Sequence, residues 1–356
     1  MSLGRASYSI CLARGDGIGP EIVDATVSVL TAISRSTHIR FDFTEVPMGD
    51  SALRVLGDPL PARSIEAFAS SDACLKGPIG ETVMAVNKKL RFGFDLYANL
   101  RPAKSYKGIC PPALRPDIDL LIVRENSEGF YRALENEIAP GIWTASGVFT
   151  ERGARRIADL SFRYAEMRSS IKHTHAKLAL ATKANIFTST HGLYLEVFKA
   201  VAHNHPEVEF NHYYADAMCA RLVKEPEQYD VIVSENLLAD LLSDLAGQVA
   251  GGLGMTPGTN INYETKHAYF EPTHGCAPDI VGKDMANPIG QIRSAALMLE
   301  YLGMMYDDPK LTKAALEIES AIEEILNSAD LSIIPKEVGG RASAAEVAEA
   351  ISERIA

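Results

Sequence analysis

Short apolar runs alternate with amphipathic stretches along almost the whole chain. The runs have the length of buried strands, and the amphipathic stretches repeat their apolar positions with helical spacing. This alternation is typical of a parallel α/β sheet with helices on its faces. The expected strands include residues 8–13, 73–76, 120–123, 178–182 and 231–234, and the expected helices include residues 20–34, 152–165, 187–203, 237–249 and 286–302.

The segment of residues 124–150 interrupts this alternation. It contains Gly, Pro and acidic residues, has no sustained helical period and follows a clear strand. A segment of this length without regular burial usually lines a site or reaches over a neighbouring molecule. We interpret it as an arm between subunits, with a mobile surface loop as the alternative.

Length and composition indicate a protein that is folded throughout. The chain has 356 residues, which is enough for two domains of typical size. Apolar residues make up 47% and charged residues 23%, as in average globular proteins. The net charge of −11, with Lys and Arg scattered singly, argues against a nucleic-acid partner. An anionic substrate would therefore need a local cationic pocket.

The five cysteines are widely spaced and include no CxxC pair, so neither a disulfide framework nor a zinc site is indicated. No stretch approaches the roughly 20 apolar residues of a membrane span, and the N-terminus lacks the apolar core of a secretory signal. We expect a cytoplasmic protein with no membrane association. A mitochondrial form whose transit peptide is absent from this sequence stays open.

Two Gly-containing motifs could contact an anionic ligand. Residues 15–21, GDGIGPE, follow the first strand and open a helix, where a tight turn and a helix N-terminus attract anions. Their spacing is GxGxG and not GxGxxG, so a structural turn explains this motif better when it is taken alone. Residues 271–280, EPTHGCAPDI, are composed as a ligand loop would be, but His274 could equally be a structural histidine.

Asp240 and Asp244 lie four residues apart in an otherwise almost wholly apolar helical segment. On a helix both carboxylates project from one face and repel each other. An exposed acidic face is the commoner explanation of such a pair. The apolar surroundings favour neutralisation instead, for which Mg²⁺ or Mn²⁺ is suited because it takes carboxylate oxygens.

Three arginines, Arg91, Arg101 and Arg124, fall within one region of the chain. The planar guanidinium matches a carboxylate, so three converging arginines would recognise a di- or tricarboxylic acid. The spacing alone does not show that they converge, and independent surface arginines remain the alternative.

In order and over nearly the whole chain, these segments resemble the isocitrate/isopropylmalate dehydrogenase family. The stretches that carry the resemblance are GDGIGPE, LKGPIGE, DLYANLRPAKS, DLLIVRENSEGFY, TKANIF, DAMCARLV, YDVIVSENLLADLLSDLAG, GGLGMTP, EPTHGCAPDIVGK and MANPIGQI.

The resemblance implies a two-domain α/β/α isopropylmalate dehydrogenase-like fold, distinct from the Rossmann fold. The large domain would comprise residues 1–99 and 254–356, and the small domain, inserted in it, residues 100–253 with an arm at about 124–150. The family is at least dimeric with shared active sites, so a homodimer or higher homo-oligomer is expected.

For the reaction, the resemblance implies oxidation and decarboxylation of a malate-like acid. It assigns Arg91, Arg101 and Arg124 to the substrate carboxylates and Tyr131 and Lys183 to acid–base chemistry. The metal ligands implied are Asp216, Asp240 and Asp244, with Lys183 and Asp216 acting in the site of the partner subunit.

For the cofactor, NADP-dependent members of the family carry Lys-Tyr where this chain has Asp279 and Ile280. An aspartate there can accept hydrogen bonds from both ribose hydroxyls and would repel a 2′-phosphate, so NAD is expected. The other residues that resemble the adenosine-binding loop are His274, Gly275, Ala277, Pro278 and Asn287.

The substrate substituent is contacted in this family by the helix before DLYAN, which here contains Asn87 and Lys88. Asn87 is similar to the asparagine of isocitrate enzymes, and isopropylmalate enzymes have apolar residues at both positions. Burying an unpaired cation beside an isopropyl group is costly, so an anionic substituent is favoured, unless Lys88 extends to solvent. We expect isocitrate or homoisocitrate first, 3-isopropylmalate next, and tartrate or D-malate last.

A non-catalytic regulatory subunit of a heteromeric isocitrate dehydrogenase is the alternative from another class. Such subunits typically lose one or more of the Arg, Tyr, Lys or Asp positions assigned above to chemistry. This chain retains all of them, which favours a catalyst.

Overall fold

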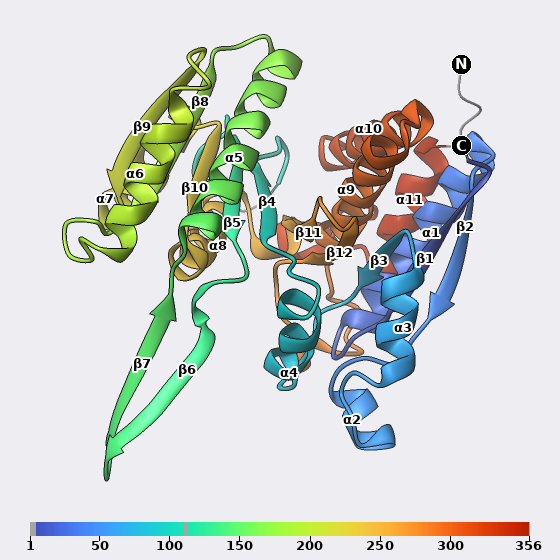
Figure 1. Cartoon of the computed structure of the whole chain (residues 1–356). Helices are drawn as coiled ribbons and strands as arrows, with labels where there is room; N and C mark the ends of the chain where they lie inside the picture. Colours follow the sequence, from blue (N-terminus) through green and yellow to red (C-terminus); the bar gives the residue numbers. More distant parts are fainter. Residues whose placement is uncertain (1–4, 110–112, 356) are drawn as a thin grey trace. The chain divides into compact units, whose positions relative to one another are not determined.

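The computed structural model describes residues 5–109 and 113–355. The chain forms two compact units (Figure 1). Unit 1 comprises Met1–Phe94, Ser105–Pro116 and Ala250–Ala356, and unit 2 comprises Asp95–Lys104 and Asp117–Val249. No helix in the described part of the chain is long and apolar enough to cross a membrane.

Unit 1 is built on a mixed sheet. Its strands in spatial order are β2 (Arg40–Glu45), β1 (Ser7–Ala13), β3 (Ala73–Lys76), β12 (His267–Pro272) and β11 (Pro257–Asn262). The first four are parallel, and β11 runs antiparallel to β12. Every residue of β3 is buried, as expected of a strand covered on both faces.

The helices of unit 1 are α1 (Gly19–Thr37), α2 (Asp50–Leu56), α3 (Ala62–Ser70), α4 (Val83–Asn87), α9 (Ile289–Tyr306), α10 (Pro309–Leu326) and α11 (Ala344–Ile355). Helix α9 lies against β3, β11 and β12 and also packs on α1 and α10, while α11 packs on α1 (Figure 1). Most residues of α9 are buried, because it is surrounded by these elements and is rich in Ala, Gly, Leu and Met.

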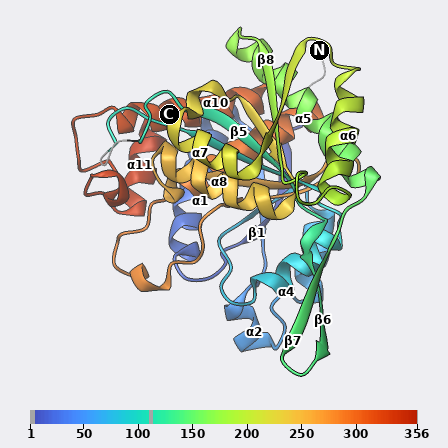
Figure 2. The same cartoon turned by 90° about the vertical axis from the view of Figure 1, so that its left-hand side faces the viewer.

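In unit 2 the strands lie in the spatial order β4 (Ala98–Lys104), β5 (Asp119–Glu125), β10 (Val231–Ser234), β8 (Ala176–Thr182) and β9 (Val208–Tyr214). Strand β4 is antiparallel to β5, and the others are parallel. The helices are α5 (Glu151–Lys172), α6 (Thr190–Ala202), α7 (Ala215–Lys224) and α8 (Asn236–Ala250). Helices α5 and α6 pack on each other and on the sheet, and Figure 2 turns α7 and α8 toward the viewer.

The segment of residues 124–150 forms the end of β5 and then an antiparallel hairpin of β6 (Gly129–Ala139) and β7 (Ile142–Val148). In Figure 1 the hairpin extends away from the helices and sheet of unit 2. Most of its side chains are exposed, including the large apolar residues Phe130, Leu134, Ile138, Ile142, Trp143 and Val148. Its contact with another subunit stays a prediction.

The α/β class expected from the sequence is confirmed, and all ten strands and helices expected by residue number occur. The expectation of a parallel sheet is wrong at β4 and β11, which are each antiparallel to one neighbour. A hairpin connection of four residues, 263–266, forces β11 and β12 to run in opposite directions. Helix α9 begins at Ile289 and not at residue 286, because Pro288 directly precedes it.

The expected domain boundaries stay a prediction, and the two units group three segments of the chain differently from them. Residues 95–99 group with unit 2, because β4 pairs with β5 over its entire length. Residues 105–116 and 250–253 group with unit 1.

A glycine of GDGIGPE allows this turn to lie close to the backbone of the loop around Cys276 in unit 1. Gly17 has φ +58°, and a Cβ there would lie 1.9 Å from the carbonyl oxygen of Cys276. The same carbonyl accepts a hydrogen bond of 3.0 Å from the backbone N–H of Ile18. A side chain at position 17 would therefore push the turn away from the loop of residues 271–283.

Gly17→Ala should destabilise unit 1 more than Gly57→Ala does. Gly57 also has positive φ, +74°, but no atom lies within 4 Å of the position that a Cβ would occupy there. The Gly57 change should cost only about 1 kcal/mol of backbone strain, whereas the Gly17 change should cost at least twice that, because the backbone must also shift. Chemical denaturation of both variants measures the difference, and equal losses would contradict the close approach.

Candidate active site

Arg101 and Arg124 lie on the neighbouring strands β4 and β5 of unit 2, and both are buried. Arg124 is 1% exposed, so its charge must be balanced within the protein. Its Nε and Nη2 donate to Oδ1 of Asn236, at the start of α8, over 2.9 and 2.7 Å. Arg101 Nε donates to Oδ1 of Asn99 at 2.8 Å. These amides fix the orientation of both guanidinium planes.

Asp240 and Asp244 lie one turn apart on α8 and meet these arginines. Arg101 Nη1 lies 2.9 Å from Asp240 Oδ1 and 3.2 Å from Asp244 Oδ1, and Arg124 Nη1 also pairs with Asp240. Arg101 additionally donates to the Ser243 hydroxyl at 2.8 Å. The pair is thus not an unpaired acidic face, and the cations compensate the repulsion between its carboxylates.

Tyr131, on β6, completes this group. Its hydroxyl donates to Asp240 Oδ2, and the guanidinium carbon of Arg124 lies 4.7 Å from the centre of its ring. Burial raises the pKa of Tyr131, and the hydrogen bond to Asp240 raises that pKa further. The phenol therefore stays protonated at neutral pH and can act as a proton donor.

Lys183 and Asp216 form a separate ion pair of unit 2, with Nζ and Oδ1 2.8 Å apart. Lys183 follows β8, and Asp216 lies in the first turn of α7. The hydrogen bond from the Lys183 ammonium holds the pKa of Asp216 below its usual value. The assignment of both residues to the site of a partner subunit stays a prediction.

The acidic residues of unit 2 suit a hard divalent cation, although one chain does not bring all three together. Asp240 and Asp244 direct oxygens toward the same guanidinium, and their side chains remain 26% and 53% exposed. Carboxylate oxygens are the ligands that Mg²⁺ and Mn²⁺ prefer. Among residues 5–109 and 113–355, no group of three or more His, Cys, Asp or Glu could hold a metal ion, so Asp216 is not joined to the pair.

The third arginine, Arg91, belongs to unit 1 and lies in a π-helical turn, Lys88–Phe92, that follows α4. Its Nε donates to the Tyr269 hydroxyl at 2.7 Å, and its Nη2 lies 3.3 Å from Glu271 Oε1. The Tyr269 hydroxyl also donates to Oδ1 of Asn87 at 3.4 Å. Arg91 and Asn87 are therefore linked through one tyrosine.

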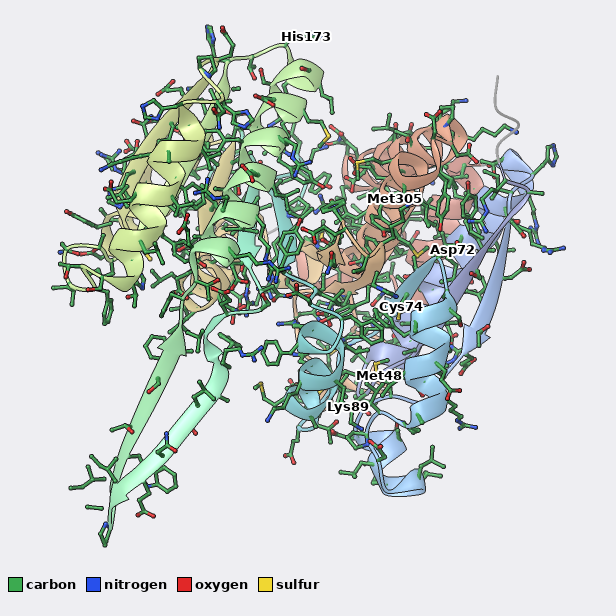
Figure 3. The ribbon with its side chains drawn as sticks, viewed as in Figure 1. Met48, Asp72, Cys74, Lys89, His173 and Met305 are labelled. Carbon is green, nitrogen blue, oxygen red and sulfur yellow. The ribbon has the colours of Figure 1, made fainter. Side chains whose placement is uncertain are left out.

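Lys88 and Lys89 of the same turn differ in their surroundings. Lys89 (Figure 3) donates to both carboxylate oxygens of Asp58, at 2.8 and 2.9 Å. Lys88 is exposed, and its side chain forms no hydrogen bond or ion pair with any described residue. Of these two lysines, Lys88 is therefore the one available to an external anion.

Unit 1 contains a cavity of about 470 Å³, within the range of small-molecule sites. It is lined by Ile18, Leu253, Gly254, His274, Gly275, Ala277, Ile280, Met285, Asn287, Lys336 and Glu337. Five of the seven residues expected to bind the cofactor are among them. Pro278 and Asp279 do not line it, but they lie between two residues that do, in the short 3₁₀ turn Pro278–Ile280.

The cavity has an apolar wall beside His274. Ile18 packs with Ile22 and Ala286, and Ala277 and Ile280 contact this cluster. His274 Nδ1 is 2.9 Å from the carbonyl oxygen of Gly275, and its buried Nε2 has no hydrogen-bond partner among the described residues. Burial lowers the pKa of His274, so the ring is neutral at pH 7 and can bind a polar ligand group.

Several residues around these groups were not expected from the sequence. Asn99, Asn236 and Ser243 orient the arginines, and Lys336 and Glu337 line the cavity from a distant C-terminal segment. The motifs GDGIGPE and GGLGMTP contain Ile18, Leu253 and Gly254 and could have indicated those three. No motif marks Lys336 or Glu337.

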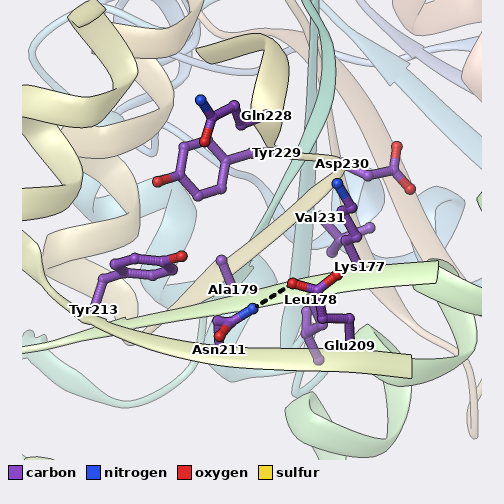
Figure 4. A pocket seen from close by; sticks show the side chains of 10 residues that line it. All are labelled: Lys177, Leu178, Ala179, Glu209, Asn211, Tyr213, Gln228, Tyr229, Asp230 and Val231. Carbon is purple, nitrogen blue, oxygen red and sulfur yellow. Dashed lines mark hydrogen bonds between the residues drawn. The ribbon is translucent and has the colours of Figure 1, made fainter. Parts of the chain in front are cut away.

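A second cavity, of about 200 Å³, lies in unit 2 between β8, β9 and the segment leading into β10 (Figure 4). Tyr213 and Tyr229 form part of its wall, with their ring planes nearly perpendicular. None of the residues expected at an active site lines it. The candidate site therefore does not include this cavity.

Comparison with known proteins shows the class of the chain, which is a decarboxylating dehydrogenase of mixed α/β fold. It belongs to the isocitrate/isopropylmalate dehydrogenase family, whose profile matches residues 9–353. A 3-isopropylmalate/3-methylmalate dehydrogenase of Methanocaldococcus jannaschii is 42% identical over 348 residues, covering 98% of this chain and 99% of the relative.

Two further relatives carry names for other substrates. An isocitrate/homoisocitrate dehydrogenase of Thermus thermophilus is 38% identical over 355 residues, covering 98% of this chain and 99% of the relative. The crystal structure of isocitrate dehydrogenase from Methylococcus capsulatus superimposes with a TM-score of 0.88 at 36% identity, covering 98% and 99% of the two chains. The names of these relatives leave the substrate of this chain unresolved.

Glu125, the residue after Arg124, makes the stability of unit 2 depend on pH. It is fully buried, and burial raises the pKa of its carboxyl to about 7. This pKa exceeds the usual 4.5, so the folded state holds the Glu125 proton more tightly than the unfolded state does. The resulting contribution to the free energy of unfolding is complete below about pH 4.5 and is lost as pH rises through about 7. The wild type should lose about 3 kcal/mol relative to Glu125→Gln between these limits.

Chemical denaturation of both proteins at pH 4 to 8 measures this difference. The exposed Glu207 provides the control, and Glu207→Gln should show no such trend relative to the wild type. A difference between wild type and Glu125→Gln that does not change with pH would contradict the assignment.

Proposed function

We propose that the protein catalyses the NAD-dependent oxidative decarboxylation of a 3-substituted malate, with isocitrate or homoisocitrate as the favoured substrate. The observation that carries this proposal is the group formed by Arg101, Arg124, Tyr131, Asp240 and Asp244. It combines cations for carboxylates, a protonated phenol and two carboxylates for a cation, which are the parts that this reaction requires.

In the proposed reaction the arginines bind the carboxylates of the acid and orient its C2 hydroxyl. Bound NAD, held by the loop around His274, would supply the hydride acceptor, and a divalent cation held by Asp240 and Asp244 would supply a Lewis acid. Lys183, in its neutral amine form, acts as the base and takes the hydroxyl proton while C2 loses its hydride. The resulting 3-carboxy ketone loses CO₂ as its C3–carboxylate electrons form an enolate, and Tyr131 then protonates C3. One NAD is reduced for each CO₂ released.

The cavity of unit 1 supports the cofactor part of the proposal. Asp279 is exposed in the turn beside it, where a carboxylate can accept hydrogen bonds from ribose hydroxyls. A 2′-phosphate at that position would meet its negative charge, which favours NAD over NADP.

For the substituent on C3, Lys88 supports an anionic group. It is exposed and has no described partner, and it lies in the same turn as Arg91. A second candidate substrate, 3-isopropylmalate, is favoured by the 42% identity to a relative named for 3-isopropylmalate and 3-methylmalate. Tartrate and D-malate, which lack both kinds of substituent, rank last.

We also propose that the protein works as a homodimer or higher homo-oligomer. The exposed apolar side chains of the β6–β7 hairpin would be buried by contact with a second subunit. Asp216 would then join Asp240 and Asp244 of the neighbouring subunit as a metal ligand, and Lys183 would act there too.

A kinetic panel of isocitrate, homoisocitrate, 3-isopropylmalate, D-malate and tartrate, each with NAD and NADP, tests this function. We expect the highest kcat/KM for a tricarboxylic acid with NAD. Lys88→Leu should shift the kcat/KM ratio toward 3-isopropylmalate by about tenfold or more, since a hydrogen bond to a charged group contributes about 1.5–3 kcal/mol. Lys89→Leu, which removes the charge paired with Asp58, should leave the ratio unchanged.

The panel has clear contrary outcomes. Inactivity of the purified protein on every acid with NAD and Mn²⁺ would refute the catalytic proposal and favour a regulatory subunit. A wild-type preference for 3-isopropylmalate that Lys88→Leu does not alter would refute the role of Lys88.

Asp240→Asn should lower kcat by about a hundredfold or more and shift the Mn²⁺ titration of activity to higher concentration. The amide keeps the shape of the side chain but is a weaker ligand for a hard cation. Direct Mn²⁺ binding measured by calorimetry gives an independent reading, and circular dichroism checks that the variant is folded. Unchanged Mn²⁺ affinity in a folded variant would exclude Asp240 as a ligand.

A further inference from the structure

Glu337 holds together the wall of the cavity in unit 1, although no motif marks it. It lies in the 3₁₀ turn Lys336–Val338, close to the C-terminal end of the chain. Its Oε1 accepts a hydrogen bond from the backbone N–H of Gly254 at 3.2 Å, and its Oε2 accepts one from Asn287 Nδ2 at 2.8 Å. One carboxylate thus joins three segments that are distant in sequence, and all three line the cavity.

The glycines of GGLG are fitted to this carboxylate. A Cβ on Gly254 would lie 1.9 Å from Glu337 Oε2, and one on Gly252 would lie 3.0 Å from Oε1. The carboxylate therefore occupies the space that side chains at positions 252 and 254 would need. The Glu337 carboxylate can occupy this position only because residues 252 and 254 are glycines.

Asn287 also contributes to this part of the cavity wall through its hydrogen bond to Glu337. The residue is 4% exposed, and its Oδ1 accepts a hydrogen bond of 3.0 Å from the N–H of Ile289, the first residue of α9. Its Nδ2 contacts Met255 Sδ at 3.3 Å as well as Glu337. The side chain of Asn287 therefore connects parts of the wall, and Glu337 supplies the acceptor that fixes its amide.

We propose that Glu337 is a positioning residue for the dinucleotide: it sets the distance between the Gly254 and Asn287 walls, between which the adenosine half binds. The inference rests on the proposed use of NAD. The dinucleotide is anionic, so the carboxylate is not its charge partner, and its contribution is geometric. Removing it should weaken dinucleotide binding without altering the chemistry at C2.

Glu337→Ala should raise the Kd and the KM for NAD by about tenfold or more, because two hydrogen bonds to a charged acceptor are lost. Turnover at saturating NAD and the KM for the acid should change by no more than about twofold. Glu337→Gln keeps one acceptor oxygen and should fall between wild type and Glu337→Ala. Calorimetric titration with NAD and steady-state kinetics measure these values.

Gly254→Ala provides a second test that retains Glu337. The added methyl group should displace the carboxylate and weaken NAD binding to a similar extent. In the Glu337→Ala background the same change should add about twofold or less, because its target is gone. Where Glu337→Ala folds poorly, the Gly254→Ala single variant still tests the proposal, because it retains Glu337.

The exposed Glu353 on α11 is the matched control, and Glu353→Ala should bind NAD like the wild type.

A wild type that binds neither NAD nor NADP would refute the proposed cofactor and this inference together. Normal NAD binding by both wild type and folded Glu337→Ala would overturn this inference alone. A fall in kcat together with equal rises in the KM for NAD and the KM for the acid would also overturn it, since these changes would indicate a general structural role.

Discussion

The buried charge of Arg124 is the constraint on which the candidate site of unit 2 depends. A guanidinium that is 1% exposed has lost almost all of its hydration and must be balanced by the protein. Asp240 supplies the opposite charge, and Asn236 and the ring of Tyr131 complete the surroundings. The alignment of α8 with the ends of β4 and β5 follows from this requirement, since both Asp240 and Asn236 lie on α8.

The cavity of unit 1 differs from this charged group, because its lining consists largely of backbone and apolar side chains. Close backbone approaches achieve this: Gly17 allows the first turn to reach the loop that carries His274, and Gly254 leaves space for Glu337. Among the described residues that line the cavity, the buried side-chain atom Nε2 of His274 has no hydrogen-bond partner. The shape of the cavity is thus set mainly by backbone and apolar side chains, and less by charged side chains.

The sequence predicted the elements of the fold better than their directions. The apolar runs at residues 73–76 and 231–234 coincide with β3 and β10, because fully buried strands leave a continuous apolar signal. Nothing in such a run records whether its neighbour is parallel, so the general expectation of a parallel sheet missed the antiparallel pairings of β4 and β11. The β6–β7 hairpin lacked this signal because most of its side chains are exposed.

The sequence by itself determined the chemical groups of this protein, namely the arginines, Tyr131, the acidic pair on α8 and the loop around His274. Their order resembles one family, and periodicity shows that Asp240 and Asp244 share a helix face. Tertiary structure decided which of these groups meet, since Arg101 and Asp244 are far apart along the chain and join through strand pairing and helix packing. It alone revealed Asn236 and Glu337, because hydrogen bonds between distant segments leave no local pattern in the sequence.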